Sequence, residues 1–134
     1  MEQLVSPGAR RVLVVEDDPT LCELLRVLLD RPGREVRIAA DGFDALRQIR
    51  YQDPDVILLD LMLPRMNGFE VVRELAAFDS DTLQRIIVLT AASESTLRDF
   101  QEKRVYRVIK KPFDIVDLTD AVEACAAKRA VNVT

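Results

Sequence analysis

Short runs of apolar, often β-branched residues recur along the chain, separated by longer segments in which apolar residues return every three or four positions. Four runs are almost continuously apolar, at residues 12–15, 56–59, 86–89 and 105–109, and a fifth, at 35–39, alternates apolar with charged residues. Runs this short and this apolar are typical of strands covered on both faces, as in a parallel sheet. The alternating run is typical of an edge strand.

Each segment between the runs opens on a helix-start signal and continues with helical spacing. The starts are predicted at Asp18-Pro19, Asp41-Gly42, Asn67-Gly68, Ser93 and Asp114. The apolar residues expected to line the helices are Leu21, Leu24, Leu25, Leu28, Phe43, Leu46, Ile49, Val71, Val72, Leu75, Leu97, Phe100, Leu118, Val122 and Cys125. A strand followed by a helix, repeated five times with short connections, predicts an α/β doubly wound fold with a five-stranded parallel sheet and five helices.

The composition limits what this fold can do. With 134 residues, 49% of them hydrophobic and 31% charged, the chain has room for one globular domain. A net charge of −4 and the lack of a Lys/Arg-rich run argue against direct nucleic-acid binding. No targeting segment or stretch of about 18 apolar residues is present, so we expect a cytoplasmic protein that does not enter a membrane.

Histidine is absent and two cysteines occur. Histidine-based acid–base catalysis and phosphohistidine chemistry on this chain are therefore excluded, as are zinc sites built from cysteine and histidine. Cys22 and Cys125 fall on predicted helices far apart in the sequence. A disulfide between them stays open, although two small hydrophobic side chains in a reducing compartment are favoured.

Polar side chains follow four of the predicted strands. Glu16 and Asp17 come after the first strand and Asp60 after the third, while Thr90 ends the fourth and Lys111 follows the fifth. In doubly wound folds the working site lies at the carboxyl ends of the strands. Any one of these residues alone would be an ordinary strand-end or surface side chain, but their joint placement predicts a single site.

The carboxylates expected at this site repel one another. Two like charges about 4 Å apart repel by roughly 4 kcal/mol at an effective dielectric constant of about 20. One lysine leaves the cluster negative, and an oxygen-only ligand set suits Mg²⁺ or Mn²⁺ rather than zinc or copper. Asp18, in contrast, is interpreted as a helix cap and not as a ligand.

Four segments stand in a characteristic order: VLVVEDD, DVILLDLMLPRMNGFEVVRELA, IIVLTA and VIKKPFD. Together they resemble the receiver domain of two-component response regulators. The resemblance implies a flavodoxin-like fold with strand order 2-1-3-4-5 and a receiver domain at residues 10–127, with an N-terminal extension at 1–9 and a C-terminal tail at 128–134. Whether the chain stands alone or belongs to a longer regulator stays open.

The resemblance also implies roles for the acidic residues. Asp60 is the expected phosphoacceptor of a phosphorelay. Asp17 and Asp60 would bind Mg²⁺ directly, Met62 would contribute its backbone carbonyl, and Glu16 would act through water.

The remaining roles concern phosphoryl transfer. Thr90 is the expected switch hydroxyl and Lys111 the lysine that contacts the phosphoryl group, beside a Lys-Pro peptide bond that is usually cis in this family. Because the chain has no histidine, the donor would be a sensor histidine kinase, a histidine phosphotransfer protein or a small molecule such as acetyl phosphate. Such a domain is not an enzyme beyond catalysing its own phosphorylation and dephosphorylation.

Output is expected through the face formed by the fourth helix, fifth strand and fifth helix, which would bind an effector or a second copy of the chain. The position that is usually aromatic in this family holds Val108. Tyr106 is predicted to point to the same side as Val108, because alternate strand residues share a face. We expect Tyr106 to pack against neighbouring helix residues without switching, so that the signal travels through the loop at residues 91–95.

Two other functions fit parts of the pattern. A phosphatase of the haloacid dehalogenase type also has an aspartate nucleophile after a strand, but Met62 replaces the second aspartate of its motif. A pseudo-receiver, which docks or dimerises without being phosphorylated, is the other alternative. The presence of Asp17, Asp60 and Lys111 argues against it.

Overall fold

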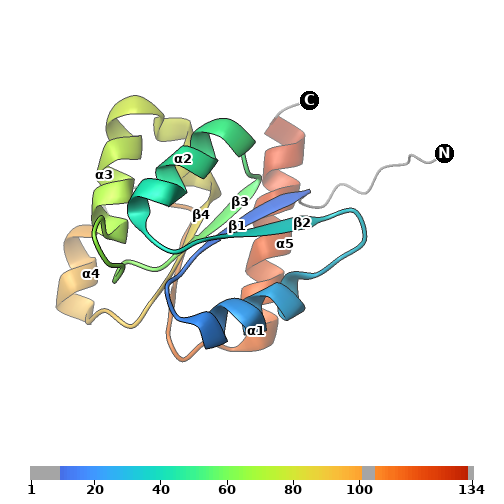
Figure 1. Cartoon of the computed structure of the whole chain (residues 1–134), viewed down its shortest axis with the longest axis horizontal. Helices are drawn as coiled ribbons and strands as arrows, with labels where there is room; N and C mark the ends of the chain where they lie inside the picture. Colours follow the sequence, from blue (N-terminus) through green and yellow to red (C-terminus); the bar gives the residue numbers. More distant parts are fainter. Residues whose placement is uncertain (1–9, 101–104, 133–134) are drawn as a thin grey trace.

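The computed structural model describes residues 10–100 and 105–132, which form a five-stranded sheet with helices on both faces (Figure 1). The expected extension at residues 1–9 lies outside the described residues. The strands are β1 (Arg11–Val15), β2 (Glu35–Ala39), β3 (Val56–Leu59), β4 (Ile86–Thr90) and β5 (Arg107–Lys110). The helices are α1 (Pro19–Leu29), α2 (Gly42–Gln52), α3 (Gly68–Phe78), the short 3₁₀ helix η1 (Ser80–Arg85), α4 (Glu94–Phe100) and α5 (Ile115–Asn132).

All neighbouring strands are parallel, and the order is β2-β1-β3-β4-β5, which confirms the predicted fold class. β2 lies at one edge, as its alternating pattern predicted. β1 pairs with β3 in a register that sets Val15 opposite Leu59. The residues that follow these two strands therefore emerge side by side at the same edge of the sheet.

The sheet is buried between two apolar layers, one on each face. Leu13 and Val15 of β1 pack with α2, α3 and α4, whereas Val12 and Val14 pack with α1 and α5. This division agrees with the arrangement of the helices in Figure 1. Each fully buried valine, leucine or isoleucine contributes roughly 1.5–3 kcal/mol of transfer free energy, so covering both faces accounts for the continuous apolar runs of β1, β3 and β4.

The predicted helix starts are confirmed. In each of the five, a side-chain oxygen accepts a hydrogen bond from a backbone N–H in the first turn; the capping residues are Asp18, Asp41, Asn67, Ser93 and Asp114. The Asn67 cap is reciprocal, because the side chain of Glu70 accepts from the Asn67 backbone N–H. These caps satisfy N–H groups that have no partner within the helix.

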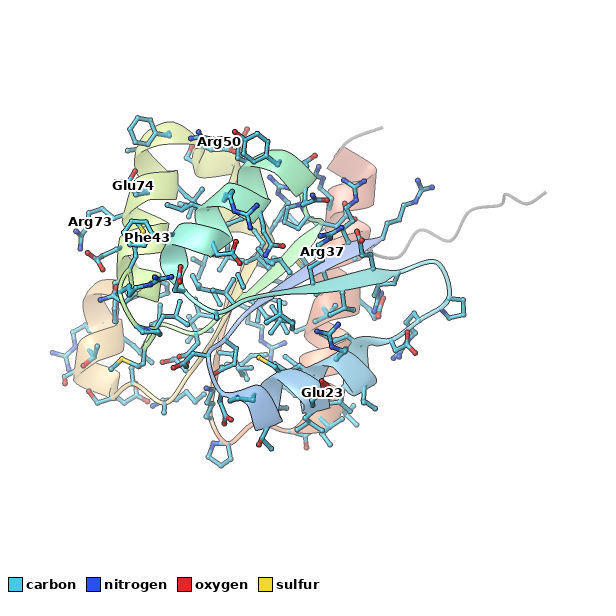
Figure 2. The ribbon with its side chains drawn as sticks, in the orientation of Figure 1. Glu23, Arg37, Phe43, Arg50, Arg73 and Glu74 are labelled. Atoms are coloured by element: carbon cyan, nitrogen blue, oxygen red, sulfur yellow. The ribbon has the colours of Figure 1, made fainter. Side chains whose placement is uncertain are left out.

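The apolar faces of two helices differ from the prediction. In α1 the buried residues are Leu25 and Leu29, while Leu24 is 42% exposed. In α2, Phe43 is 62% exposed at the start of the helix (Figure 2); Ile49 is buried as predicted, and Ala45, which was not predicted to line the helix, is buried as well. Both errors have one cause: large apolar side chains were assigned inward, whereas the residues that face the sheet are spaced by four, whatever their size.

The fifth strand was predicted to begin at Val105, two residues before it does. β5 begins at Arg107, and Tyr106 lies in a bend before it. Tyr106 packs with Ile109 on the α1/α5 face, whereas Val108 packs on the opposite face, so the prediction that Tyr106 and Val108 share a side was wrong. Strand alternation begins only at Arg107, because the bend turns the Tyr106 ring toward α5, where Lys128 Nζ lies 5.7 Å from the ring centroid.

Two features of the secondary structure differ from the sequence-based expectation. The 3₁₀ helix η1 was not predicted, and α5 continues to Asn132, past the residue at which the domain was expected to end.

Cys22 and Cys125 are free thiols, and burial raises the pKa of Cys125 to about 11. Among residues 10–100 and 105–132, none of the helices has the length and apolar composition needed to cross a membrane.

An ion network fixes the end of the sheet remote from the strand carboxyl ends. Asp53, in a left-handed conformation (φ 48°) at the end of α2, accepts hydrogen bonds from Arg85 at 3.0 Å and from Arg129 at 2.9 Å. Burial alone would raise the pKa of Asp53, but the hydrogen bond from Arg85 and the charges of Arg129 and Arg85 outweigh it and hold the pKa below 3.8. Asp53 thus links α2 to η1 and α5.

We expect Asp53→Asn to lower the free energy of unfolding by about 1 kcal/mol at neutral pH, because the ion pairs are lost while asparagine still accepts the left-handed conformation. A carboxyl whose pKa is depressed by folding stabilises the protein above its unfolded pKa and loses that effect as the pH falls through its folded pKa. The difference from wild type should therefore shrink below pH 3.8. Urea unfolding followed by circular dichroism at neutral and acid pH measures it.

Asp30→Asn is the matched control, since Asp30 also ends a helix but makes no side-chain ion pair with any residue between 10 and 100 or between 105 and 132. An equal loss of stability in both variants, or a difference that persists at low pH, would count against this role for Asp53.

Candidate functional site

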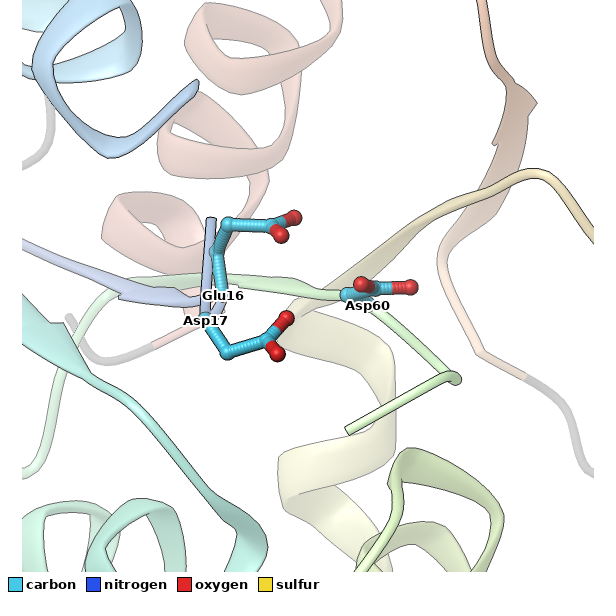
Figure 3. Close-up of side chains that lie close together, drawn as sticks. All are labelled: Glu16, Asp17 and Asp60. Carbon is cyan, nitrogen blue, oxygen red and sulfur yellow. The ribbon is translucent and has the colours of Figure 1, made fainter. Parts of the chain in front are cut away.

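Glu16, Asp17 and Asp60 converge at the carboxyl ends of β1 and β3 (Figure 3). One carboxylate oxygen from each lies within 4.8 Å of the others. The Asp60 backbone N–H donates to the Val15 carbonyl at 3.0 Å, which continues the β1–β3 ladder by one residue and brings Asp60 beside Glu16. Glu16 and Asp60 are buried, at 3% and 6% exposure, and Asp17 is exposed. The cluster thus has two sheltered carboxylates and one that faces solvent.

Lys111 brings a positive charge to this cluster. Its Nζ lies 3.1 Å from Glu16 Oε1 and 3.6 Å from Asp60 Oδ2. The Lys111 backbone N–H donates to the Thr90 carbonyl at 2.8 Å, and the Lys111-Pro112 peptide bond is cis, as the resemblance implied. The neighbouring Lys110 points elsewhere, with its Nζ 2.7 Å from Glu94 Oε2 on α4. Only one of the two adjacent lysines therefore reaches the carboxylates.

The electrostatics of Glu16 reflect this setting. Burial raises the pKa of the Glu16 carboxyl above its ordinary value, and the nearby Asp60 charge adds to the rise. Hydrogen bonds from the Asp18 backbone N–H at 3.1 Å and from Lys111 oppose it by favouring the ionised form. The net effect is a raised pKa, because the hydrogen bonds compensate only part of the effect of burial.

Met62 lies two residues after Asp60 in the chain, and Thr90 ends β4, the strand that pairs with β3. Thr90 is fully buried at the end of β4, and its Oγ1 accepts a hydrogen bond from the Ala92 backbone N–H at 3.0 Å. The Met62 backbone N–H donates to Asp60 Oδ1 at 3.0 Å, while its side chain is 61% exposed. The contribution of the Met62 carbonyl to a metal site stays a prediction, as does the part of Thr90 in phosphoryl transfer.

The donor set fits a hard divalent cation. Every side-chain donor in the cluster is a carboxylate oxygen, and the spacing of the three oxygens lets a single ion approach all of them. Lys111 compensates one of three negative charges, so the site retains an attraction for a cation. Asp18, which caps α1 through the Thr20 N–H, lies outside this set, as predicted.

Sequence reasoning missed two residues that hold the neighbourhood of the site together. Asp41 was interpreted only as a helix cap, but its buried carboxylate also pairs with Arg65, in the segment between β3 and α3. The residues are 24 positions apart, and no periodicity or motif links them. Asp41 could have been singled out as a polar residue at the end of β2; Arg65 carried no signal of its own.

Comparisons with known proteins agree on one family. The family model described as "Response regulator receiver domain" matches residues 12–123. The DNA-binding response regulator MtrA of Mycolicibacterium smegmatis is 44% identical over 86 residues, which cover 64% of this chain and 36% of that protein. This chain therefore spans only about a third of that relative. Sporulation initiation phosphotransferase F of Bacillus subtilis is 31% identical, with 84% of this chain and 90% of that protein covered.

A solved structure shares the overall fold. The receiver domain of a sensor histidine kinase from Pseudomonas aeruginosa PAO1, described with a magnesium ion coordinated in its active-site cleft, is 28% identical to this chain with a TM-score of 0.77. The alignment covers 89% of this chain and 98% of that one.

We expect Asp17→Asn to weaken Mg²⁺ binding about tenfold or more, because the loss of one carboxylate–cation contact worth about 1.4 kcal/mol corresponds to that factor. Isothermal titration calorimetry with MgCl₂ measures the affinity. Asp18→Asn is the control, since asparagine also caps a helix and Asp18 lies outside the cluster. Equal affinities for wild type and Asp17→Asn would contradict the assignment of Asp17.

Proposed function

The chain belongs to the response regulator receiver domain family, and we propose that Asp60 accepts a phosphoryl group from a histidine kinase or phosphotransfer protein in a two-component pathway. One observation carries the proposal. Asp60 is a sheltered carboxylate with the cationic Lys111 Nζ 3.6 Å from its Oδ2 and with carboxylate oxygens of two further acids within 4.8 Å. It combines a nucleophile with the charges that phosphoryl transfer needs.

The chain's own residues would perform the transfer as follows. A carboxylate oxygen of Asp60 attacks the phosphorus, the P–N bond of the donor's phosphohistidine breaks, and an acyl phosphate forms while the departing imidazole takes a proton from solvent. Lys111 binds one phosphoryl oxygen and the Thr90 hydroxyl another. The Met62 N–H, which hydrogen-bonds Asp60 Oδ1, holds the other carboxylate oxygen in place during attack.

Mg²⁺, or Mn²⁺ in its stead, would neutralise charge on a third phosphoryl oxygen when bound. Asp17, Asp60 and the Met62 carbonyl would hold it directly, with Glu16 acting through water. The same residues would later admit the water that removes the phosphoryl group. The chain would thus catalyse only its own phosphorylation and dephosphorylation.

The signal would leave through α4, β5 and α5. Two ion pairs cross this face: Lys110 with Glu94 of α4 at 2.7 Å, and Arg107 with Asp117 of α5 at 2.8 Å. Movement of Thr90 toward the phosphoryl group would shift the loop at residues 91–95, because the Ala92 N–H hydrogen-bonds the Thr90 hydroxyl. An effector or a second copy of the chain would recognise the altered face.

Partners of this kind are proteins. The net charge of −4 speaks against direct nucleic-acid binding, and the DNA-binding description of MtrA concerns a protein of which this chain matches 36%. A cytoplasmic location is part of the proposal, since both cysteines are free thiols, as in a reducing compartment.

The rival functions have less support. A haloacid dehalogenase-type phosphatase needs a general acid two residues after the nucleophile, where Met62 has only a thioether. Lys111 lies 3.1 Å from Glu16 and 3.6 Å from Asp60, the two buried acids. A pseudo-receiver would not need a lysine at this position.

We expect acetyl phosphate or phosphoramidate with Mg²⁺ to add one phosphoryl group to the wild type and none to Asp60→Asn, because an amide is not a nucleophile of this kind. Intact-mass spectrometry detects the adduct, which mild base should remove as it does other acyl phosphates. Asp55→Asn, with an aspartate at the opposite end of β3, is the control. Equal phosphorylation of Asp60→Asn and wild type would refute the acceptor assignment.

We expect Lys111→Ala to reduce the response of the 91–95 loop to the phosphoryl mimic beryllofluoride by at least about half, and Lys110→Ala to change it far less. The strand pleat directs the two lysines to opposite sides, so only Lys111 can bind the mimic. Amide chemical-shift changes in two-dimensional NMR measure the response. Equal responses in the two variants would contradict this division between the lysines.

A further inference from the structure

The segment between β3 and α3, residues 60–67, carries part of the candidate site on one side and a separate set of anchors on the other. On the site side, the Met62 N–H donates to Asp60 Oδ1. Leu61 and Leu63 are buried, at 0% and 8% exposure, so their side chains fix the segment to the core. The backbone at Met62 therefore has little freedom to move without moving Asp60.

The far end of this segment is attached to the start of α2. The Arg65 guanidinium pairs with the Asp41 carboxylate, and the Met66 carbonyl accepts a hydrogen bond from the Gly42 N–H at 2.8 Å. A side chain at Gly42 would put its Cβ 2.3 Å from that carbonyl oxygen, so the two backbones are in direct contact. Asp41 and Gly42, at the start of α2, thus contact Arg65 and Met66 of the β3–α3 segment.

Arg65 has an unfavourable backbone conformation at this contact. Its φ is 60°, in the left-handed region that arginine rarely adopts. The segment turns sharply at Arg65, and its partner across the turn is Asp41, 8% exposed in its side chain. The turn is fixed before Arg65 by the buried Leu63 and after it by Asn67, which caps α3.

We propose that the Asp41–Arg65 ion pair is a positioning device: it holds the 60–67 segment so that Met62 keeps its backbone in place for cation binding and for orienting Asp60. The inference rests on the proposed function, because it concerns the same cation. Neither Asp41 nor Arg65 belongs to the carboxylate cluster. They would act only through the segment that joins Asp60 to α3, as residues outside the ligand set commonly do in metal sites.

The ordinary interpretation is that Asp41 only caps α2 and that Arg65 only covers it. Asp41 does cap the helix, through the Asp44 N–H at 2.9 Å. Arg65 is 70% exposed in its side chain, so its pair with Asp41 contributes little to the free energy of unfolding. The two interpretations differ in what the pair changes: stability alone, or cation affinity at nearly unchanged stability.

A double-mutant cycle separates these interpretations. Asp41→Asn removes the charge but keeps a side chain that caps helices well, and Arg65→Asn removes the guanidinium but tolerates the left-handed conformation. Mg²⁺ affinity is measured by calorimetry for both single variants and the double variant, with thermal unfolding of each in the absence of metal. Arg47→Gln is the matched control, because Arg47 pairs with Asp44 on the exposed side of the same helix.

We expect each single variant to bind Mg²⁺ about three- to fivefold more weakly, because the pair can bias the segment by no more than its own interaction energy of up to about 1 kcal/mol. The double variant should lose no more than either single variant, because the two side chains act as one unit. Arg65→Lys, which keeps the charge, should recover part of the affinity, and Arg47→Gln should match wild type.

Unchanged Mg²⁺ affinity in Arg65→Asn, or losses that multiply in the double variant, would overturn the positioning role while leaving the proposed function intact. A lower unfolding temperature with wild-type affinity would do the same, since it indicates a purely structural pair. Failure of the wild type itself to bind Mg²⁺ would overturn the proposed function and this inference together.

Discussion

Mutual repulsion among Glu16, Asp17 and Asp60 is the constraint on which the rest of the structure depends. Their oxygens lie within 4.8 Å of one another, and two of the three side chains are almost fully buried. Left to itself, such a cluster would push β1 and β3 apart. It persists because the strands that carry it are fixed by apolar contacts on both faces of the sheet, and because Lys111 lies 3.1 Å from one buried acid and 3.6 Å from the other.

This repulsion also explains why the segments around the site are held so firmly. A carboxylate that is repelled by its neighbours moves unless its own backbone is fixed. The Asp60 backbone donates to Val15, and one carboxylate oxygen accepts from the Met62 N–H. Farther out, the backbone contact of Gly42 with Met66 joins the β3–α3 segment to α2. Successive contacts of this kind hold the three carboxylates close together despite their mutual repulsion.

The sequence was sufficient to predict whatever depends on local chemistry. Continuous apolar runs predicted the strands, capping residues such as Asp18 and Asn67 predicted the helix starts, and polar residues after the strands predicted which side chains meet. Packing partners were less accessible. Phe43 was expected inside and is exposed, because hydrophobicity does not reveal that the small Ala45, beside the correctly predicted Ile49, occupies the face toward the sheet. The alternation of apolar residues does not indicate the bend at Tyr106. Because of this bend, the Tyr106 ring lies on the face of the sheet opposite to the predicted one.

The end of β5 shows how one strand can serve two purposes at once. Lys110 is the last residue of β5 and Lys111 the first residue after it, and their side chains reach different partners even though they are adjacent and chemically identical. Lys111 reaches the buried acids, and Lys110 reaches Glu94 in the first turn of α4. A displacement of Lys111 toward a phosphoryl group would act on the same short backbone that carries Lys110, whose exposed ion pair reaches Glu94 of α4. In the proposed function, this would give a route from the carboxylate cluster to the α4–β5–α5 face that does not require an aromatic side chain at the position of Val108.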